Sequence, residues 1–222
     1  MANYIMTVPA VALFPYTVKP DAYGDKSEYK VTLLLDKNDP EQNEEANRLA
    51  ALYLAAVREG ITGRREDGSA IKDKNGNVKA PFVGHDLADK EWLKTVYSPV
   101  EDGDAAVFAA GPNRGQLKNV KYPEYKGHWV VTVKSLADYY DPKNTIGMDR
   151  RPLTEEYSGM PVRVNINAYP HKGKDVMSVG FAMRAVLKTG EGERLRTGAA
   201  DDPIAGFGLP DMTDDPLAGM GV

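Results

Sequence analysis

One stretch of the sequence, residues 161–169, carries polar side chains at a spacing that could bind a nucleic acid. Its even positions are all apolar, whereas its odd positions after Pro161 are Arg163, Asn165, Asn167 and Tyr169. Because a strand points alternate side chains to opposite faces, we expect these four groups on the outer surface of a sheet. A guanidinium pairs with phosphates, carboxamides hydrogen-bond base edges and a phenol ring stacks on a base. The alternative is the ordinary solvated face of a half-exposed sheet.

Further cationic side chains fall where they could extend this surface. Lys134 and Arg184 take the polar parity of two other predicted strands, and Lys172 and Lys174 lie in the turn before the last strand. Aromatic and basic side chains also crowd the neighbouring loops, and stacking on aromatic rings binds single strands without sequence preference. These loop candidates are Tyr125, Lys126, Tyr139, Tyr140, Arg150 and Arg151.

Charge is segregated along the 222 residues of the chain. Residues 1–111 carry 13 basic and 18 acidic side chains, residues 112–198 carry 15 and 9, and residues 199–222 carry none and 5. The three segments therefore have net charges of −5, +6 and −5. An ordinary solvated surface could give the same numbers. The positions of the charges on the strands are therefore better evidence for a binding surface than their number.

The last 22 residues repeat the phrase Asp-Asp-Pro-x-Ala-Gly-x-Gly. Its Gly and Pro oppose regular structure, its aspartates repel one another, and its apolar residues are too few to offset the entropy of ordering the backbone. The sequence predicts a flexible acidic tail over 199–222 that competes with a polyanion or recruits a partner. Its candidate partner-binding residues are Asp201, Asp202, Phe207, Asp211, Asp214, Asp215, Leu217 and Met220.

The elements that would position these groups are mostly strands. The predicted fold class is mainly β with one helix, a five-stranded OB-fold-like barrel with long loop insertions in a single domain over residues 1–198. The helix of an OB-fold often lies between its third and fourth strands, whereas here it follows the second. Runs rich in β-branched and aromatic residues predict strands at 3–18, 28–35, 128–135, 161–169 and 175–187.

Between the strands, the sequence predicts one long helix and several loops. Asn38 or Asp39 can cap the helix, Pro40 suits its first position, and Gly60 ends it. Residues 60–81 are polar and glycine-rich, which predicts an exposed insertion with a hairpin turn at its centre. The remaining predictions are a short helix within 86–96, a turn at 99–104 and a loop at 109–126.

Catalytic and metal-binding signals are weak. The chain has no cysteine, which excludes disulfides, thiolate metal sites and cysteine nucleophiles. His85, His128 and His171 stand singly, and no phosphate-binding loop or nucleophile elbow occurs. Asp102 and Asp104 resemble a carboxylate pair for Mg²⁺, although a turn explains them better. We therefore expect no enzyme, no cofactor and no metal.

Membrane and secretion signals are weak as well. No apolar run reaches the roughly 18 residues of a membrane span. The first residues lack the basic-then-apolar layout of a signal peptide. We expect the protein in the cytoplasm.

Several phrases in the sequence point to a family. The most specific is Tyr157-Ser158-Gly159 leading into Val162-Arg163. The others are Tyr125-Lys126-Gly127, Ser135, Arg150-Arg151-Pro152-Leu153, Tyr169, Lys172-Gly173, Gly180 and Gly192-Glu193-Arg194-Leu195 before Asp201-Asp202. Together they resemble the phage single-stranded-DNA-binding proteins with an OB-fold, over most of residues 1–202.

The resemblance implies a function as well as a fold. A member of this family coats single-stranded DNA during phage replication or recombination, in the cytoplasm of the host cell. It has an OB core and forms a homodimer, and its acidic tail works with replication proteins such as a polymerase or a helicase-primase. Three alternatives stay open from the residues themselves: a phage structural or assembly protein with a β-barrel, a Mg²⁺-dependent nuclease, and a strand-annealing recombination protein.

Overall fold

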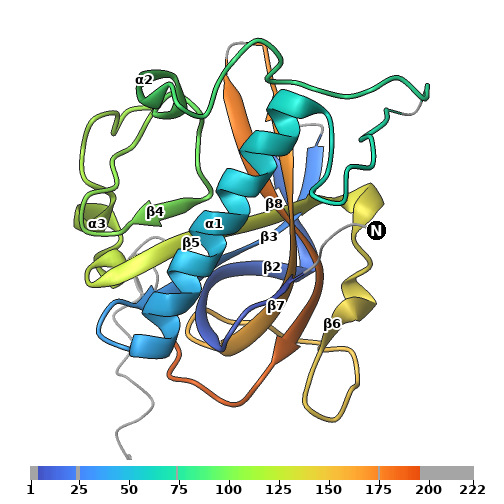
Figure 1. Cartoon of the computed structure of the whole chain (residues 1–222). Coiled ribbons are helices and arrows are strands. Elements are labelled where there is room, and N and C mark those ends of the chain that lie inside the picture. Colours follow the sequence, from blue (N-terminus) through green and yellow to red (C-terminus); the bar gives the residue numbers. More distant parts are fainter. Residues whose placement is uncertain (1–4, 24–25, 74, 175, 196–222) are drawn as a thin grey trace, which may run out of the picture.

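The computed structural model describes residues 5–23, 26–73, 75–174 and 176–195, which form one strongly curved sheet with a long helix beside it (Figure 1). The predicted mainly β class is confirmed, and the described residues form eight strands. Four of the five predicted strands are present as single strands, whereas the strand predicted at 3–18 divides into β1 and β2. The strands are β1 (Ile5–Met6), β2 (Ala10–Tyr23), β3 (Lys26–Asp36), β4 (Val100–Asp102), β5 (His128–Leu136), β6 (Thr145–Ile146), β7 (Pro161–Lys172) and β8 (Met177–Lys188). The helices are α1 (Pro40–Thr62), α2 (Lys90–Leu93) and α3 (Lys118–Lys121), with 3₁₀ turns η1 (Pro123–Tyr125), η2 (Ala137–Tyr139) and η3 (Pro142–Asn144).

The sheet is an open barrel. Its strands run in the order β4-β5-β3-β2-β7-β8-β6, and β1 continues the line of β2 along β7. The two arms curl until β5 and β8 approach each other, and in the described residues no strand ladder joins these two. Instead, the Ser135 hydroxyl donates to the Met183 carbonyl (3.0 Å) and accepts from the Met183 amide (3.1 Å). One side chain therefore holds the two arms together at this point.

Residues 97–102 fill the opening where β5 and β8 diverge. The Tyr97 amide donates to the Met177 carbonyl on β8 (2.9 Å), and the Thr132 amide on β5 donates to the Pro99 carbonyl (2.9 Å). β4 then pairs with β5. The sequence predicted only a turn here, because three strand residues give too short a pattern to detect.

Apolar side chains at alternate strand positions fill the interior of the barrel. On β7, Val162, Val164 and Ile166 are fully buried, which confirms the predicted parity of this strand. They pack in one core with inward side chains of β3 and β5 and with Phe181 of β8. Each such side chain contributes about 1.5–3 kcal/mol relative to an exposed position. The polar positions between them are therefore left to the outer surface.

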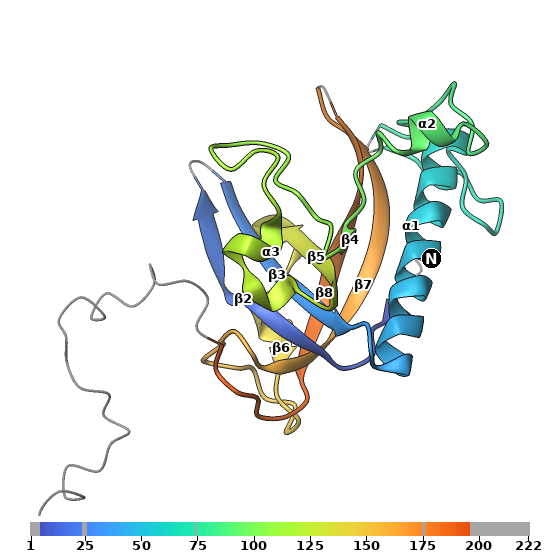
Figure 2. The same ribbon diagram turned by 90° about the vertical axis from the view of Figure 1, so that its left-hand side faces the viewer.

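Helix α1 begins and ends for local reasons. The Asp39 carboxylate accepts from the amides of Glu41 (2.9 Å) and Gln42 (3.2 Å), which identifies the cap between the two predicted candidates. The helix continues past the predicted stop at Gly60 and ends at Gly63, whose φ of 65° suits a glycine. Figure 2 shows α1 beside β7, the strand with which it makes its closest packing.

The insertion at 60–81 is exposed over most of its length, as predicted. Its first residues still belong to α1, and two isolated bridges, Arg64 with Ala70 and Lys72 with Val78, then fold it back on itself. The Asp73 carboxylate closes the central turn by accepting from the amides of Asn75 (2.8 Å) and Asn77 (3.0 Å).

The Tyr157-Ser158-Gly159 phrase holds the last described residues against the barrel. The Ser158 carbonyl accepts from the Leu195 amide (2.9 Å). The Tyr157 hydroxyl donates to the Glu191 carboxylate (2.8 Å) and accepts from the Gly192 amide (3.1 Å). The chain beyond Leu195 therefore starts from a fixed position on the barrel.

Substitution of Gly159 tests how much this contact contributes to the stability of the fold. Its φ is 102°, and a Cβ atom there would lie 1.8 Å from the Glu193 carbonyl oxygen. Gly115 is the matched control, because its φ of 80° is also strained for other residues but its surroundings are open. We expect Gly115→Ala to lower the free energy of unfolding by about 1 kcal/mol and Gly159→Ala by about 3 kcal/mol or more in urea denaturation. Equal losses would show that the contact with residues 191–195 is unimportant for stability.

Candidate nucleic-acid interface

The predicted polar row on β7 is only partly open. Arg163, Asn165, Asn167 and Tyr169 are all half-buried. The Arg163 Nε donates to the Thr7 carbonyl (2.8 Å), and the Asn165 side-chain oxygen is buried where β1 pairs with β7. The first half of the row therefore supports the N-terminal segment, and the second half is left to contact a ligand. Alternation predicts the face of a side chain but not the segment that covers it.

The ring of Tyr169 is held in place by a glycine. It lies against Gly180, its partner on β8, where a Cβ atom would come within 2.5 Å of the ring. Burial raises the pKa of the Tyr169 phenol. A ring that is already fixed loses little conformational entropy when a base stacks on its other side.

Three cations from neighbouring strands continue the outer surface beside Tyr169. Lys30 on β3 lies opposite Lys134 on β5, and the Ser135–Met183 contact brings the end of β5 next to Arg184 on β8. We name the surface formed by Lys30, Lys134, Arg184, Asn167 and Tyr169 the polar sheet face. Lys30 was not among the predicted site residues, because only the first residues of its strand alternate and the rest form a buried apolar run.

Arg184 lies at an irregularity of the β7–β8 ladder. Asn165 faces Ala185 across the ladder, whereas Ile166 faces Met183. Arg184 is therefore the additional residue of a β-bulge, and its side chain is exposed. The prediction that Arg184 shares the outer face with Gly180 agrees with this geometry.

Ion pairs already engage two of these cations. Lys134 Nζ lies 3.6 Å from a Glu28 carboxylate oxygen, and Lys30 pairs with Asp21. Pairs at such exposed positions contribute about 0–1 kcal/mol. A phosphate group can therefore replace Glu28 at little cost, whereas the shorter, half-buried pair with Asp21 holds Lys30 more firmly.

Two predicted lysines lie on the β7–β8 hairpin at one end of the molecule (Figure 1). Lys172 and Lys174 are exposed on either side of Gly173, whose amide donates to the Val176 carbonyl (2.9 Å). The hairpin continues the strands that carry Tyr169 and Gly180. Its two charges therefore extend the polar sheet face beyond the barrel.

Two predicted stacking rings are instead part of the core. Tyr125 is 7% exposed and packs in a small cluster outside the barrel with Leu13. Tyr140 is 5% exposed, and its hydroxyl lies 2.6 Å from the Thr145 hydroxyl. Burial raises the pKa of both phenols to about 12. Neither ring has an open face for a base, whereas Tyr139 is 79% exposed.

Three predicted cations lie apart from the polar sheet face. Lys126 precedes β5 and is about eight residues, or roughly 25 Å of strand, from Lys134. Arg150 and Arg151 lie on the exposed turn after β6, at the end of the molecule opposite the β7–β8 hairpin (Figure 1). Sequence position could not separate these residues from the others, because loops of similar composition lie at both ends of the barrel.

The acidic pair considered for Mg²⁺ is occupied by a lysine. Lys37 Nζ bonds to Asp102 and to Asp104 (2.6 Å to the latter). These hydrogen bonds lower the pKa of both carboxyl groups. In the part of the chain that the structure describes, no group of three or more His, Asp or Glu side chains could hold a metal ion. No described helix is long and apolar enough to cross a membrane.

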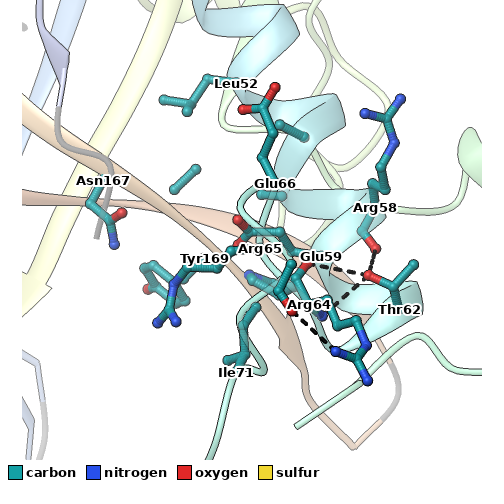
Figure 3. A pocket seen from close by; sticks show the side chains of 15 residues that line it. Leu52, Arg58, Glu59, Thr62, Arg64, Arg65, Glu66, Ile71, Asn167 and Tyr169 are labelled. Carbon is teal, nitrogen blue, oxygen red and sulfur yellow. Dashed lines mark hydrogen bonds between the residues drawn. The ribbon is translucent and has the colours of Figure 1, made fainter. Parts of the chain in front are cut away.

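A pocket that the sequence did not predict adjoins the polar sheet face. It has a volume of about 510 Å³ and lies between the end of α1, the loop that follows it and β7 (Figure 3). Arg58, Arg64 and Arg65 line it, and Asn167 and Tyr169 form its strand side. The sequence does place these three arginines within eight residues at the end of a helix, which could have indicated an anion-binding site. Their position beside β7 depends on the fold and could not be predicted.

The predicted tail residues lie outside the described part of the chain. They are Asp201, Asp202, Phe207, Asp211, Asp214, Asp215, Leu217 and Met220.

Comparisons with known proteins found a family and several solved structures that are similar to this chain. A family model described as Enterobacter phage Enc34, ssDNA-binding protein matches residues 12–217. The structure of the single-stranded DNA-binding protein from bacteriophage Enc34 is similar with a TM-score of 0.56 at 18% identity, over 89% of this chain and 87% of that one. The same protein in complex with ssDNA gives 0.55 at 17% identity, over 87% and 89%. Bacteriophage T7 gp2.5, a single-stranded DNA binding protein, gives 0.51 at 14% identity over 100% of both chains. No curated protein sequence matches significantly.

Nitration can distinguish the buried rings from the exposed one. Tetranitromethane attacks the phenolate form, so burial and a raised pKa both protect a tyrosine. We expect Tyr139 to be nitrated first at neutral pH, and Tyr125 and Tyr140 to react only after unfolding. Fragmentation mass spectrometry resolves the adjacent Tyr139 and Tyr140. Equal modification of these two in the folded protein would contradict the assignment of Tyr140 to the core.

Proposed function

We propose, because the chain belongs to the family of the Enterobacter phage Enc34 ssDNA-binding protein, that it coats single-stranded DNA during phage replication and recombination in the host cytoplasm. The observation that carries the proposal is the polar sheet face, where cations, a carboxamide and a fixed aromatic ring follow one another across four strands. The protein binds and protects the strand and does not cleave it.

The roles of the residues follow from their chemistry. Lys134, Arg184, Lys172 and Lys174 bind phosphates, and so does Lys30. Tyr169 stacks on a base and Asn167 hydrogen-bonds to a base edge. Every base has an aromatic face and every nucleotide a phosphate, so such a surface accepts any sequence. The exposed ring of Tyr139, just after β5, gives a second stacking position.

Binding of a labelled oligo-dT at two salt concentrations tests this function. We expect the affinity to fall steeply with salt and to exceed the affinity for duplex DNA. Lys134→Gln is expected to weaken binding and to reduce the logarithmic salt slope by ~0.7, the value for one phosphate contact on a single strand. Lys94→Gln removes another exposed lysine with an ion-pair partner, outside the polar sheet face, and should change neither quantity. Absence of oligo-dT binding, or equal binding to duplex, would contradict the function.

We also propose two roles for residues 199–222, which carry a net charge of −5. This segment competes with DNA for the polar sheet face, and DNA displaces it so that it can recruit a phage polymerase or helicase-primase. The segment also carries the apolar residues Phe207, Leu217 and Met220, which give a partner something to bind besides charge. The chain acts as a homodimer.

A protein that ends at Gly198 tests the role of the acidic segment. We expect it to bind oligo-dT more tightly than the full chain at low salt, with the difference vanishing at high salt where charge is screened. It should also lose coprecipitation with the replication partner. Unchanged affinity at low salt would contradict the competition. Sedimentation equilibrium of the full chain tests the dimer, because a mass of 24.3 kDa would identify a monomer.

A further inference from the structure

The pocket between α1 and β7 has the size and lining of a nucleotide site. Its volume of about 510 Å³ falls in the range of ligand pockets, roughly 300–1,000 Å³. Figure 3 shows Asn167 and Tyr169 on the strand side and Arg58, Glu59 and Thr62 on the helix side. Apolar side chains complete the walls, among them Leu52 and Ile71. A base needs apolar walls and a phosphate needs cations, and this pocket offers both.

The arginines of the pocket have hydrogen-bonding capacity left for a phosphate. Arg64 donates to the Gly68 carbonyl (3.1 Å), and Arg65 donates to the Ser69 hydroxyl (3.4 Å). Within the described residues, no carboxylate lies within 4 Å of a nitrogen of Arg58, Arg64 or Arg65. Each guanidinium has five N–H donors, so most of them stay available.

Two carboxylates, those of Glu59 and Glu66, also line the pocket. Glu59 lies near Arg65, whose charge lowers the Glu59 pKa, but burial raises it by more. Glu66 lies in the loop beside Arg65. Three arginines against two glutamates leave a net positive charge. The carboxylates repel a phosphate placed next to them but can accept a hydrogen bond from a base N–H, so the base and not the phosphate belongs on the glutamate side.

The pocket is continuous with the polar sheet face. Tyr169 contacts Gly180 with one part of its ring and lines the pocket as well, and Asn167 likewise belongs to both. A strand that crosses Lys134, Arg184 and Tyr169 therefore meets the pocket next. A second pocket, lined by Tyr53 and Tyr97, shares no residue with the polar sheet face.

We propose that this pocket binds one nucleotide of the single strand that leaves the polar sheet face past Tyr169, with Arg64 and Arg65 on its phosphate and its base against the wall formed by Leu52 and Ile71. The proposal rests on the function proposed above. It also gives the 60–81 insertion a role, since this loop supplies both arginines and Ile71.

Oligo-dT of increasing length tests the pocket in the full chain. We expect affinity to rise by about tenfold once the oligonucleotide is long enough to reach from the polar sheet face into the pocket, which corresponds to one stacked and ion-paired nucleotide. Arg65→Gln should abolish most of this increase and leave the affinity for the shortest bound oligonucleotide unchanged. Unchanged short-oligonucleotide binding also shows that the variant is folded. Arg65→Lys should restore part of the increase, and Arg114→Gln, on an exposed loop elsewhere, should retain all of it.

A second measurement identifies the contact directly. Oligo-dT with a photoreactive 5-iodouracil should crosslink to residues 62–71 only when it exceeds the threshold length. The proposed nucleotide pocket would be overturned if the Arg65→Gln variant kept the full length-dependent increase, or if no crosslink reached residues 62–71. Either result would leave the proposed function intact. A wild-type protein that binds no oligo-dT of any length would overturn the proposed function itself.

Discussion

The approach of β5 to β8 is the constraint on which the rest of the molecule depends. These strands come from the two arms of the sheet and share no ladder in the described residues, so the barrel relies on Ser135, which bonds to both backbone groups of Met183, and on residues 97–102. Because the arms meet, side chains that are distant in sequence become neighbours on one outer surface. Lys134 reaches Arg184 only across this junction. A flat sheet of the same strands would separate them.

Alternation explains both what the sequence predicts and where prediction stops. The parity of 161–169 identified the buried face of β7 correctly, because inward positions of a barrel must be apolar. The same parity could not show that Arg163 would support Thr7, the residue after β1, since that contact joins residues 156 positions apart. Tyr140 was predicted as a stacking ring for its place in a polar loop. Its burial depends on Thr145, which in turn donates to the Thr17 carbonyl on β2 (2.9 Å).

Counting charges overstated the number of free cations, because many are paired within the fold. Lys118 bonds to Glu101 (2.6 Å) and Lys37 to two aspartates, so neither is available to a polyanion without losing buried or short contacts. The Lys134–Glu28 pair on the polar sheet face is different, because Lys134 lies 3.6 Å from Glu28 and is half exposed. A ligand can use the cations whose ion pairs are long and exposed, because these pairs contribute little free energy. Only the structure distinguishes such cations from those in short or buried pairs.

The Tyr157 contact determines what the acidic segment can reach. Leu195 is held in the small cluster that contains Leu34 of β3, on the outer side of the barrel, and Lys30 lies four residues along the same strand, about 13 Å away. The 27 residues that follow Leu195 can span at most roughly 90 Å. Competition with DNA is therefore possible within one molecule. Such competition does not weaken on dilution, and it depends on salt in the same direction as DNA binding does. DNA binding itself is bimolecular, so a strand displaces the segment only where the DNA concentration and the number of phosphate contacts together outweigh the fixed effective concentration of the segment.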